Sequence, residues 1–305
     1  RAYLQAGRVE VKTGVRVLAC ETANKRVCAV TTTEGKLTAH AVILATGGLS
    51  HPETGSNGDG FAILRALGLR IVTSHAALAP VRTKEPWTHE CSGLAFPDAK
   101  VTLLLDGTRV ASRKGKLLFT HFGLSGPLIL NMSSTIRDRM REGVLSLVID
   151  LFPATDIGTL DHELRDRCDA GRNRKLKNVL AEMVPERLAL GLCTLLGDWG
   201  DRPVHSLTKA ERRLLAQTLK SITLTPSGLL GAEHAIVTSG GVPLETLDMK
   251  TMAFPEFPNL FVTGDLLDID RPSGGYSLQL CWSTGWVAGS AAATLAIDSR
   301  THHDR

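Results

Sequence analysis

Several common signatures of function are missing from this sequence. Its 305 residues contain no C-x-x-C pair, and no group of His, Cys and carboxylate residues has the spacing of a metal site. Scattered cysteines are typical of reduced thiols in a cytoplasmic protein and argue against a disulfide framework. We therefore expect a cytoplasmic protein without a bound metal. The six cysteines are Cys20, Cys28, Cys91, Cys168, Cys193 and Cys281.

Charge of a single sign is also scarce. The chain has 35 Lys and Arg residues against 31 Asp and Glu residues, and its net charge is only +4. Such a mild excess does not by itself indicate a nucleic-acid partner. The densest basic group, GRNRKLKN, contains Arg172, Arg174, Lys175 and Lys177, with no aromatic residue between them. We interpret it as a solvated helix face, and contact with RNA stays open as the alternative.

Long hydrophobic runs are nearly absent. The chain starts at RAYLQAGRVEV, with neither a Met nor the apolar core of a signal peptide, so we expect it to begin in mid-fold. The one long uncharged run is 276–297, which also contains Ser, Thr and Gln side chains. These polar groups argue against a membrane span. We predict a helix buried in the protein core, with Cys281 as a packed thiol.

The sequence does contain an ordered succession of strand and helix patterns. The first 45 residues alternate like β-strands, and the unbroken apolar run 41–45 is typical of a central strand covered on both faces. A helix pattern at 58–70 is followed by strands over 78–151, with a hairpin signal at Asp106-Gly107. Helical spacing follows over 156–220, and the chain closes with strand patterns and the long uncharged run. The simplest arrangement is one α/β domain built from both ends of the chain, with a β unit and a helical unit inserted.

One local signal marks where a helix begins within the helical unit. Thr208 precedes a helical pattern and Glu211 follows three residues later, which is the spacing of a capping box. We therefore expect a helix to start directly after Thr208.

Three predicted strands end in glycine, namely ILATGG, IVTSGGV and LFVTGD. Such ends let a backbone approach a ligand at the carboxyl edge of a parallel sheet, although each could equally be an ordinary turn. Asp265, directly after the last strand, can accept two hydrogen bonds from a sugar-like diol or serve as a turn residue. Gly274 and Gly275 precede the long helix, whose first amides can hold an anionic or electron-rich group.

Five stretches occur in a fixed order: ILATGGLSHPETGSNGDGFAILRALG, GKLLFTHFGLSGPLIL, KLKNVLAEMVPERL, AIVTSGGVPLETLDMKTM and NLFVTGDLLDIDRPSGGYSLQLCWSTGWVAG. Together, over roughly residues 8–292, they closely resemble the BaiN-like NAD(P)/FAD-dependent oxidoreductases, which include aminoacetone-oxidase-like flavoproteins. The match of several stretches in order is far more specific than any single glycine motif.

The resemblance implies an α/β fold. Its glutathione-reductase-type, Rossmann-like FAD-binding domain would be N-terminally incomplete and interrupted by a β-barrel-like unit with a helical insert. The implied FAD-binding domain covers residues 1–75 and 251–305. The β-barrel-like unit covers 76–155 and returns at 223–250, and the helical insert covers 156–222.

The resemblance also implies which residues bind FAD. Val15 would meet the adenine through its backbone, and the ATGG stretch would lie along the dinucleotide. Gly264 and Asp265 would bind the ribityl or pyrophosphate region, and the residues that begin the long helix would lie beside the flavin ring. His121, the GLSGP turn, Gly240 and Gly241 would be neighbours of the cleft. The implied cofactor-binding residues are Val15, Ala45, Thr46, Gly47, Gly48, Gly264, Asp265, Gly274, Gly275, Tyr276 and Ser277.

Three departures from the family pattern bear on this site. The family normally has Glu where this chain has Asp265, and Tyr-Asn where it has Tyr276-Ser277. No G-x-G-x-x-G occurs near the start, although the family carries one about a hundred residues before the equivalent of Arg1. We therefore expect this chain alone to retain FAD weakly or not at all.

The leading hypothesis is an FAD-dependent oxidoreductase that transfers hydride between FAD and a small organic substrate or NAD(P)H. His121 is a candidate acid or base, and a histidine satisfied by local backbone is the alternative. Two other hypotheses remain open: a nucleic-acid-directed flavoprotein that uses the basic helical insert, and a non-catalytic fragment without bound cofactor. We expect a small-molecule substrate and no membrane partner.

Overall fold

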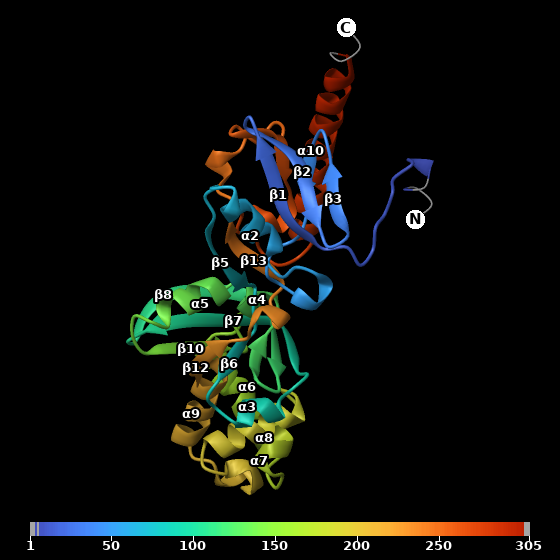
Figure 1. The fold of residues 1–305 in the computed structure, drawn as a ribbon. Coiled ribbons are helices and arrows are strands. Elements are labelled where there is room, and N and C mark those ends of the chain that lie inside the picture. Colours follow the sequence, from blue (N-terminus) through green and yellow to red (C-terminus); the bar gives the residue numbers. More distant parts are fainter. Residues whose placement is uncertain (1–3, 5, 302–305) are drawn as a thin grey trace. The chain divides into compact units, whose positions relative to one another are not determined.

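The computed structural model describes residue 4 and residues 6–301, and the chain forms two compact units. Unit 1 combines both ends of the chain and comprises Arg1–Ala76, Val237–Arg271 and Gly275–Arg305 (Figure 1). Unit 2 comprises Ala77–Ile236 and the short segment Pro272–Gly274. The predicted α/β architecture, in which inserted segments separate the two halves of one domain, is confirmed. The finer division into five segments stays a prediction.

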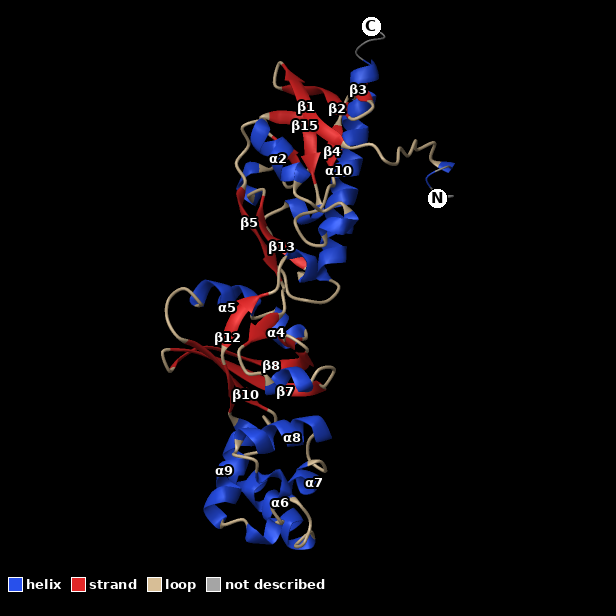
Figure 2. Cartoon of the chain, turned by 60° about the horizontal axis from the view of Figure 1, so that its bottom comes forward, coloured by secondary structure: helices blue, strands red, loops and turns tan. Residues whose placement is uncertain are grey.

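Unit 1 contains three small sheets (Figures 1 and 2). The first is an antiparallel meander of β1 (Val17–Ala23), β2 (Arg26–Thr32) and β3 (Gly35–Thr38). The second has the order β14 (Ala253–Phe254), β15 (Phe257–Val262) and β4 (Val42–Leu44), and β15 runs parallel to β4. The third pairs β13 (Val237–Gly241) with β5 (Val72–Ala77).

The helices of unit 1 enclose an apolar core around the β4–β15 pair. Among the described residues, its named α-helices are α2 (Asp59–Ala66) and α10 (Tyr276–Thr301), and its named 3-10 turns are η1 (Pro52–Thr54), η5 (Leu244–Thr246) and η6 (Gly264–Leu266). Phe61 and Leu64 of α2 pack with Phe261 of β15 and Ala288 of α10 in one buried cluster. Burial of such side chains is the main favourable term that holds these elements together.

The prediction of a buried helix at the end of the chain is wrong. One side of α10 packs on β4 and β15, where Thr284 and Ala288 are buried. On the opposite side Trp282 is 65% exposed and Trp286 is 79% exposed. The run is apolar on most sides, so its composition did not reveal that only one side is covered by the described residues. Cys281 is likewise exposed and is not the packed thiol that we predicted.

The uncharged run also has the length of a membrane span. By length and composition alone Tyr276–Ile297 could cross a bilayer, and a single such helix is weak evidence for a membrane protein. Figure 1 shows α10 as the long red helix of unit 1.

The prediction that the apolar run at 41–45 is a central strand is also wrong. β4 stands at the edge of its sheet, with β15 as its one strand neighbour among residues 4 and 6–301. Leu44 is buried, whereas the side chain of Ile43 is 40% exposed. An unbroken apolar run predicts a strand with two apolar faces, but it does not say whether both faces and both edges find partners.

Unit 2 is built on a seven-stranded antiparallel sheet. Its order is β11 (Ile222–Leu224), β10 (Leu145–Asp150), β7 (Ala95–Leu105), β8 (Thr108–Thr120), β9 (Gly123–Ser125), β6 (Val81–Thr83) and β12 (Pro226–Leu229). The two outermost strands, β11 and β12, are joined in the chain through Thr225 alone. The sheet must therefore curl until its edges meet, which agrees with the predicted barrel-like unit. The predicted hairpin is confirmed, since Asp106 and Gly107 both have positive φ between β7 and β8.

Short helices connect and cover this sheet. They are α3 (Trp87–Glu90), α4 (Pro127–Leu130), α5 (Ser133–Arg139) and the 3-10 turn η4 (Ala232–His234). Pro127 lies in the first turn of α4, where proline fits because that amide has no helical partner.

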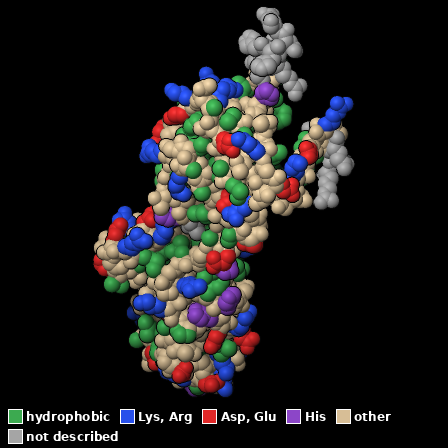
Figure 3. All heavy atoms as spheres, in the orientation of Figure 1, with side chains coloured by type: hydrophobic (Ala, Val, Ile, Leu, Met, Phe, Trp, Pro, Cys, Tyr) green, Lys and Arg blue, Asp and Glu red, His purple; other side chains and the backbone are tan. Residues whose placement is uncertain are grey.

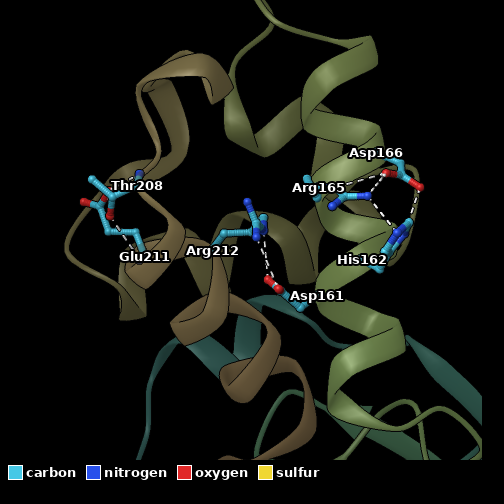
Figure 4. A network of polar contacts seen from close by, with 7 residues as sticks. All are labelled: Asp161, His162, Arg165, Asp166, Thr208, Glu211 and Arg212. Carbon is cyan, nitrogen blue, oxygen red and sulfur yellow. Dashed lines mark hydrogen bonds and ion pairs between the residues drawn. The ribbon is translucent and has the colours of Figure 1, made fainter.

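The helical insert contains α6 (Ile157–Ala170), α7 (Leu176–Leu180), α8 (Glu186–Leu195), α9 (Lys209–Lys220) and the 3-10 turns η2 (Trp199–Asp201) and η3 (Val204–Ser206). On the face that Figure 3 shows, basic and acidic side chains are interspersed over this part. The predicted capping box is confirmed, because Thr208 and Glu211 exchange side-chain and backbone hydrogen bonds at the start of α9 (Figure 4). Figure 4 also shows the ion pair of Arg212 with Asp161, which joins α9 to α6.

Candidate functional site

Two of the strands that end in glycine, β4 and β15, are parallel neighbours in one sheet of unit 1. In the parallel pair, Leu44 of β4 lies opposite Val262 of β15, and the backbone amide of Thr263 donates to the carbonyl oxygen of Leu44 at 3.2 Å. The stretch from Ala45 to Gly48 and the pair Gly264-Asp265 therefore begin at the same edge. This is the carboxyl edge, where open α/β sheets bind their ligands.

The third glycine-ended strand meets the same edge through tight backbone packing. The hydroxyl of Thr238 in β13 accepts a hydrogen bond from the amide of Leu49 at 2.6 Å. A Cβ atom on Gly48 would lie 2.1 Å from that hydroxyl, and one on Gly241 would lie 2.4 Å from the carbonyl oxygen of Leu266. These two glycines are therefore required for chain packing, whatever their contact with a ligand.

Val15 lies just before β1 and close to the start of α2. Its neighbour Arg16 donates two hydrogen bonds, at 2.8 and 2.7 Å, to the carboxylate of Asp59, the first residue of α2. The next residue, Gly60, packs so closely on Thr46 that a Cβ would lie 2.1 Å from the Thr46 hydroxyl. Arg16, the neighbour of Val15, and Thr46 thus both contact the start of α2.

The first turn of α10 adjoins Gly264. The amide of Gly264 donates to the hydroxyl of Thr284 at 3.0 Å, which ties the end of β15 to α10. A Cβ on Gly275 would meet nothing within 4 Å, and Tyr276 is 61% exposed, so the helix start is open to solvent. The amides of a first helical turn lack helical partners and favour electron-rich groups. Gly274 has φ of +120° and is grouped with unit 2.

Arg271 also belongs to this region, although it was not among the residues predicted from the sequence. Its Nε donates to Ser277 Oγ at 2.9 Å, its Nη1 donates to the carbonyl of Ile269 at 2.6 Å, and its Nη2 forms an ion pair with Asp265. Arg271 is the one basic residue between β15 and α10, and that was the signal in the sequence that could have identified it.

The carboxylate of Asp265 lies in a desolvated setting. Its side chain is 19% exposed, and burial raises its pKa above the ordinary value, while the Arg271 charge and the backbone amide of Thr238 act in the opposite direction. Although Cys281 as a residue is exposed, its thiol faces the same carboxylate, where partial desolvation raises the pKa of the thiol as well. One oxygen of Asp265 is thus paired with a cation beside a helix start.

These residues fit the ribityl and flavin part of FAD in three respects. The carboxyl edge of a parallel strand pair, an acceptor suited to hydroxyl groups and an open helix start occur within unit 1. In one respect the fit is altered, because Arg271 already occupies one side of the acceptor.

Two further features are a histidine of unit 2 and a hollow of unit 1. His121 belongs to unit 2, where its ring is exposed and meets Phe122 edge-on with centroids 4.8 Å apart. A hollow of about 670 Å³ in unit 1 is lined by Val27, His40 and Asn259, among others. Since His40 precedes β4, this hollow lies at the amino end of the parallel strands and not at the edge where a cofactor is expected.

Comparison with known proteins adds a family. Residues 1–291 match the family described as "HI0933-like protein Rossmann domain". The ribosomal RNA dihydrouridine synthase of Escherichia coli (strain K12) is 34% identical over 246 residues, which cover 81% of this chain and 59% of that protein. The 3-dehydro-bile acid delta(4,6)-reductase of Clostridium scindens is 30% identical over 292 residues, which cover 95% of this chain and 71% of that protein.

A ribosomal RNA dihydrouridine synthase of Haemophilus influenzae is 29% identical over 248 residues, covering 81% of this chain and 58% of that protein. The chain therefore spans about 58% to 71% of the length of these curated relatives.

Proposed function

The chain belongs to the HI0933-like family of Rossmann-fold flavoprotein oxidoreductases, which includes BaiN-like enzymes, and from this premise we propose that it forms the FAD-binding part of a reductase. The observation that carries the proposal is the meeting of the β4 and β15 carboxyl ends beside Asp265 and the first turn of α10. FAD would supply hydride transfer, and NAD(P)H would be the electron donor. We place this activity in the cytoplasm.

The cofactor would be held by groups from both halves of unit 1. Asp265 would accept hydrogen bonds from ribityl or ribose hydroxyls, and the stretch from Ala45 to Gly48 would lie along the dinucleotide. Gly275, Tyr276 and Ser277 would present the first amides of α10 to the electron-rich edge of the flavin ring. Val15 would contact the adenine through its backbone.

The substrate class is proposed from the chemistry that the relatives' names share. A delta(4,6)-reductase and a dihydrouridine synthase both add two hydrogen atoms across a carbon–carbon double bond. In such a reaction hydride goes to one carbon and a proton to the other, while NAD(P)H is oxidised. We therefore propose a small organic alkene conjugated with a carbonyl, since the carbonyl accepts the charge that develops when hydride adds.

Titration of the 305-residue chain with FAD tests the site. We expect little flavin after purification, because the chain contains no G-x-G-x-x-G stretch, but saturable binding of added FAD. Asp265→Asn should weaken binding by about tenfold or more, which corresponds to one hydrogen bond to a charged group. Glu245→Gln, at an exposed carboxylate of the same unit, is the matched control.

The results of that titration test two predictions separately: weak retention of FAD during purification, and a binding site at Asp265. Near one FAD per purified chain would contradict the expectation of weak retention and would strengthen the site. Absence of saturable binding to added FAD, or equal affinity in Asp265→Asn and Glu245→Gln, would overturn the proposed site. Reduction of added FAD by NADH or NADPH, followed as loss of flavin absorbance, tests the proposed electron donor.

The second candidate function is reduction of a base in RNA, which the names of two relatives favour. The basic group in the helical insert supports it only weakly, because Arg174 pairs with Glu182, and both Lys175 and Lys177 pair with Asp201. Such pairing leaves less positive charge for phosphates. Binding of ribosomal RNA fragments with a steep salt dependence, lost in a triple Ala variant at Arg172, Arg174 and Lys175, would favour this candidate.

A further inference from the structure

Arg271 is a buried cation whose hydrogen bonds join three segments at the carboxyl edge of the β4–β15 pair, where FAD binding is proposed. Its side chain is 5% exposed, and its guanidinium group reaches Asp265 after β15, Ser277 in the first turn of α10 and the carbonyl of Ile269 in the loop between them. A guanidinium group presents several donors in a fixed planar fork, so one orientation satisfies all three acceptors. The loop between β15 and α10 is therefore closed by a single side chain.

The two side-chain partners of Arg271 lie on either side of its loop. Asp265 lies in the turn that follows β15, and Ser277 lies in the first turn of α10. The guanidinium group bonds to both of them. The three side chains therefore form one continuous polar arrangement beside the start of α10.

The cation also determines what Asp265 can do. A desolvated carboxyl group takes up a proton more readily, and a protonated carboxyl group is a poorer acceptor for two hydroxyls. The groups that face this carboxylate are Arg271 from the loop, the Cys281 thiol from α10 and the backbone amide of Thr238 from β13. Arg271 is the one cation among them, and its charge opposes the rise in the pKa of Asp265 that burial causes.

We propose that Arg271 is a positioning residue for the cofactor: it holds Asp265 ionised and fixes it against Ser277 in the first turn of α10. The carboxylate is thereby a preset acceptor for the hydroxyl groups of a ribityl or ribose chain. This inference rests on the proposed function, because it assigns Arg271 a part in FAD binding.

The first measurement needs no cofactor. Urea unfolding of the full chain is compared for the wild type, Arg271→Met, Asp265→Asn and the double variant. Hydrogen exchange of peptides from unit 1 reports the unfolding of that unit. A coupling of about tenfold in the unfolding equilibrium constant is expected, because the two side chains are in contact. Arg70→Met, at an exposed ion pair with Glu245, is the control and should leave stability nearly unchanged. Additive effects of Arg271→Met and Asp265→Asn on stability would show that the two side chains do not stabilise each other, and would overturn the positioning role of Arg271.

The second measurement is the pH dependence of FAD affinity. Wild-type affinity should fall as the pH falls through the raised pKa of Asp265, and in Arg271→Met this fall should begin at a higher pH. Asp265→Asn should lose the pH dependence altogether. Arg271→Met should also weaken binding about tenfold or more near neutral pH, whereas Arg70→Met should not. Identical pH profiles in wild type and Arg271→Met would overturn the positioning role.

A milder variant keeps the test decisive if Arg271→Met does not fold. Arg271→Lys retains the charge but loses the planar fork, so it should keep the wild-type pH profile while binding FAD more weakly. Wild-type affinity in Arg271→Lys would overturn the requirement for the fork. Absence of FAD binding by the wild-type chain at every pH would refute the proposed function and the cofactor role of Arg271 together. The coupling between Arg271→Met and Asp265→Asn in urea unfolding tests the contact of the two side chains separately.

Discussion

The side chain of Asn259 ties two distant strands of unit 1 together, and replacing it by Asp should separate them. Asn259 precedes the apolar part of β15 and is buried. Its Oδ1 accepts from the amide of Val27 at 2.9 Å, and its Nδ2 donates to the carbonyls of Val27 at 2.7 Å and His40 at 3.0 Å. The meander of β1–β3 is thereby attached to the parallel β4–β15 pair.

The expected cost follows from these three bonds. In Asn259→Asp the amide group is replaced by a carboxylate oxygen, so the carbonyls of Val27 and His40 lose their donor and face a negative charge. Each buried polar group left without a partner costs about 1–3 kcal/mol. We expect the free energy of unfolding to fall by about 2–6 kcal/mol at neutral pH, the sum for the two carbonyls.

The loss should depend on pH in a defined direction. Protonation would return one donor to the carboxyl group, so the pKa of the new Asp is raised in the folded chain above its unfolded value of about 3.9. Stability of the variant is therefore highest below that unfolded value and is lost as pH rises through the raised folded pKa. The wild type has no such titration at this position.

Hydrogen exchange measured by mass spectrometry is the suitable assay, because a chain of two units need not unfold in one step. Peptides covering β2 and β15 should exchange faster in Asn259→Asp, and the difference should grow from pH 5 to pH 8. Asn24→Asp adds the same charge at an exposed turn and should stay within about 0.5 kcal/mol of wild type. A loss below about 1 kcal/mol without pH dependence would refute the reasoning.

Three further predictions concern the helices. Thr208→Ala should lower stability of the helical insert by about 1 kcal/mol in urea unfolding, and Thr208→Ser should restore it. The Arg202 ion pair and the Thr208 bonds hold the pKa of Glu211 at about 2. The stability that ionised Glu211 gives to α9 should therefore be lost as the pH falls from about 4.5 to about 2, which circular dichroism can follow. Trp282 and Trp286 should be strongly quenched by acrylamide in this chain, and a blue-shifted, unquenched fluorescence from single-Trp variants at these positions would contradict their exposure.

Local signals in the sequence predicted local structure well. The hairpin at Asp106-Gly107 and the capping box of Thr208 and Glu211 are confirmed because each depends on a few neighbouring residues with fixed conformational preferences. The family resemblance assigned the ATGG stretch and Gly264-Asp265 to one cofactor, and the structure places both at the carboxyl ends of the parallel strands β4 and β15. These predictions needed no knowledge of what packs on what.

Contacts between residues far apart in the chain could not be predicted from local sequence signals. Asn259 is 232 residues from Val27, and nothing in its local pattern indicates that it bridges two strands. Arg271 could be singled out as a lone cation in its loop, but its orientation toward both Asp265 and Ser277 depends on how β15 and α10 meet. Such contacts depend on tertiary geometry, which the order of residues does not show directly.

The sequence by itself determined the α/β succession, the turns and helix starts, the glycine-ended strands and the family resemblance, because these depend on local conformation and residue order. The tertiary structure alone decided which apolar surfaces are covered. It left Ile43 of β4 and Trp282 and Trp286 of α10 exposed, and it turned Arg271 onto Asp265. Burial and ion pairing depend on which groups meet in space, so the same apolar run can be a buried helix in one setting and a half-covered helix here.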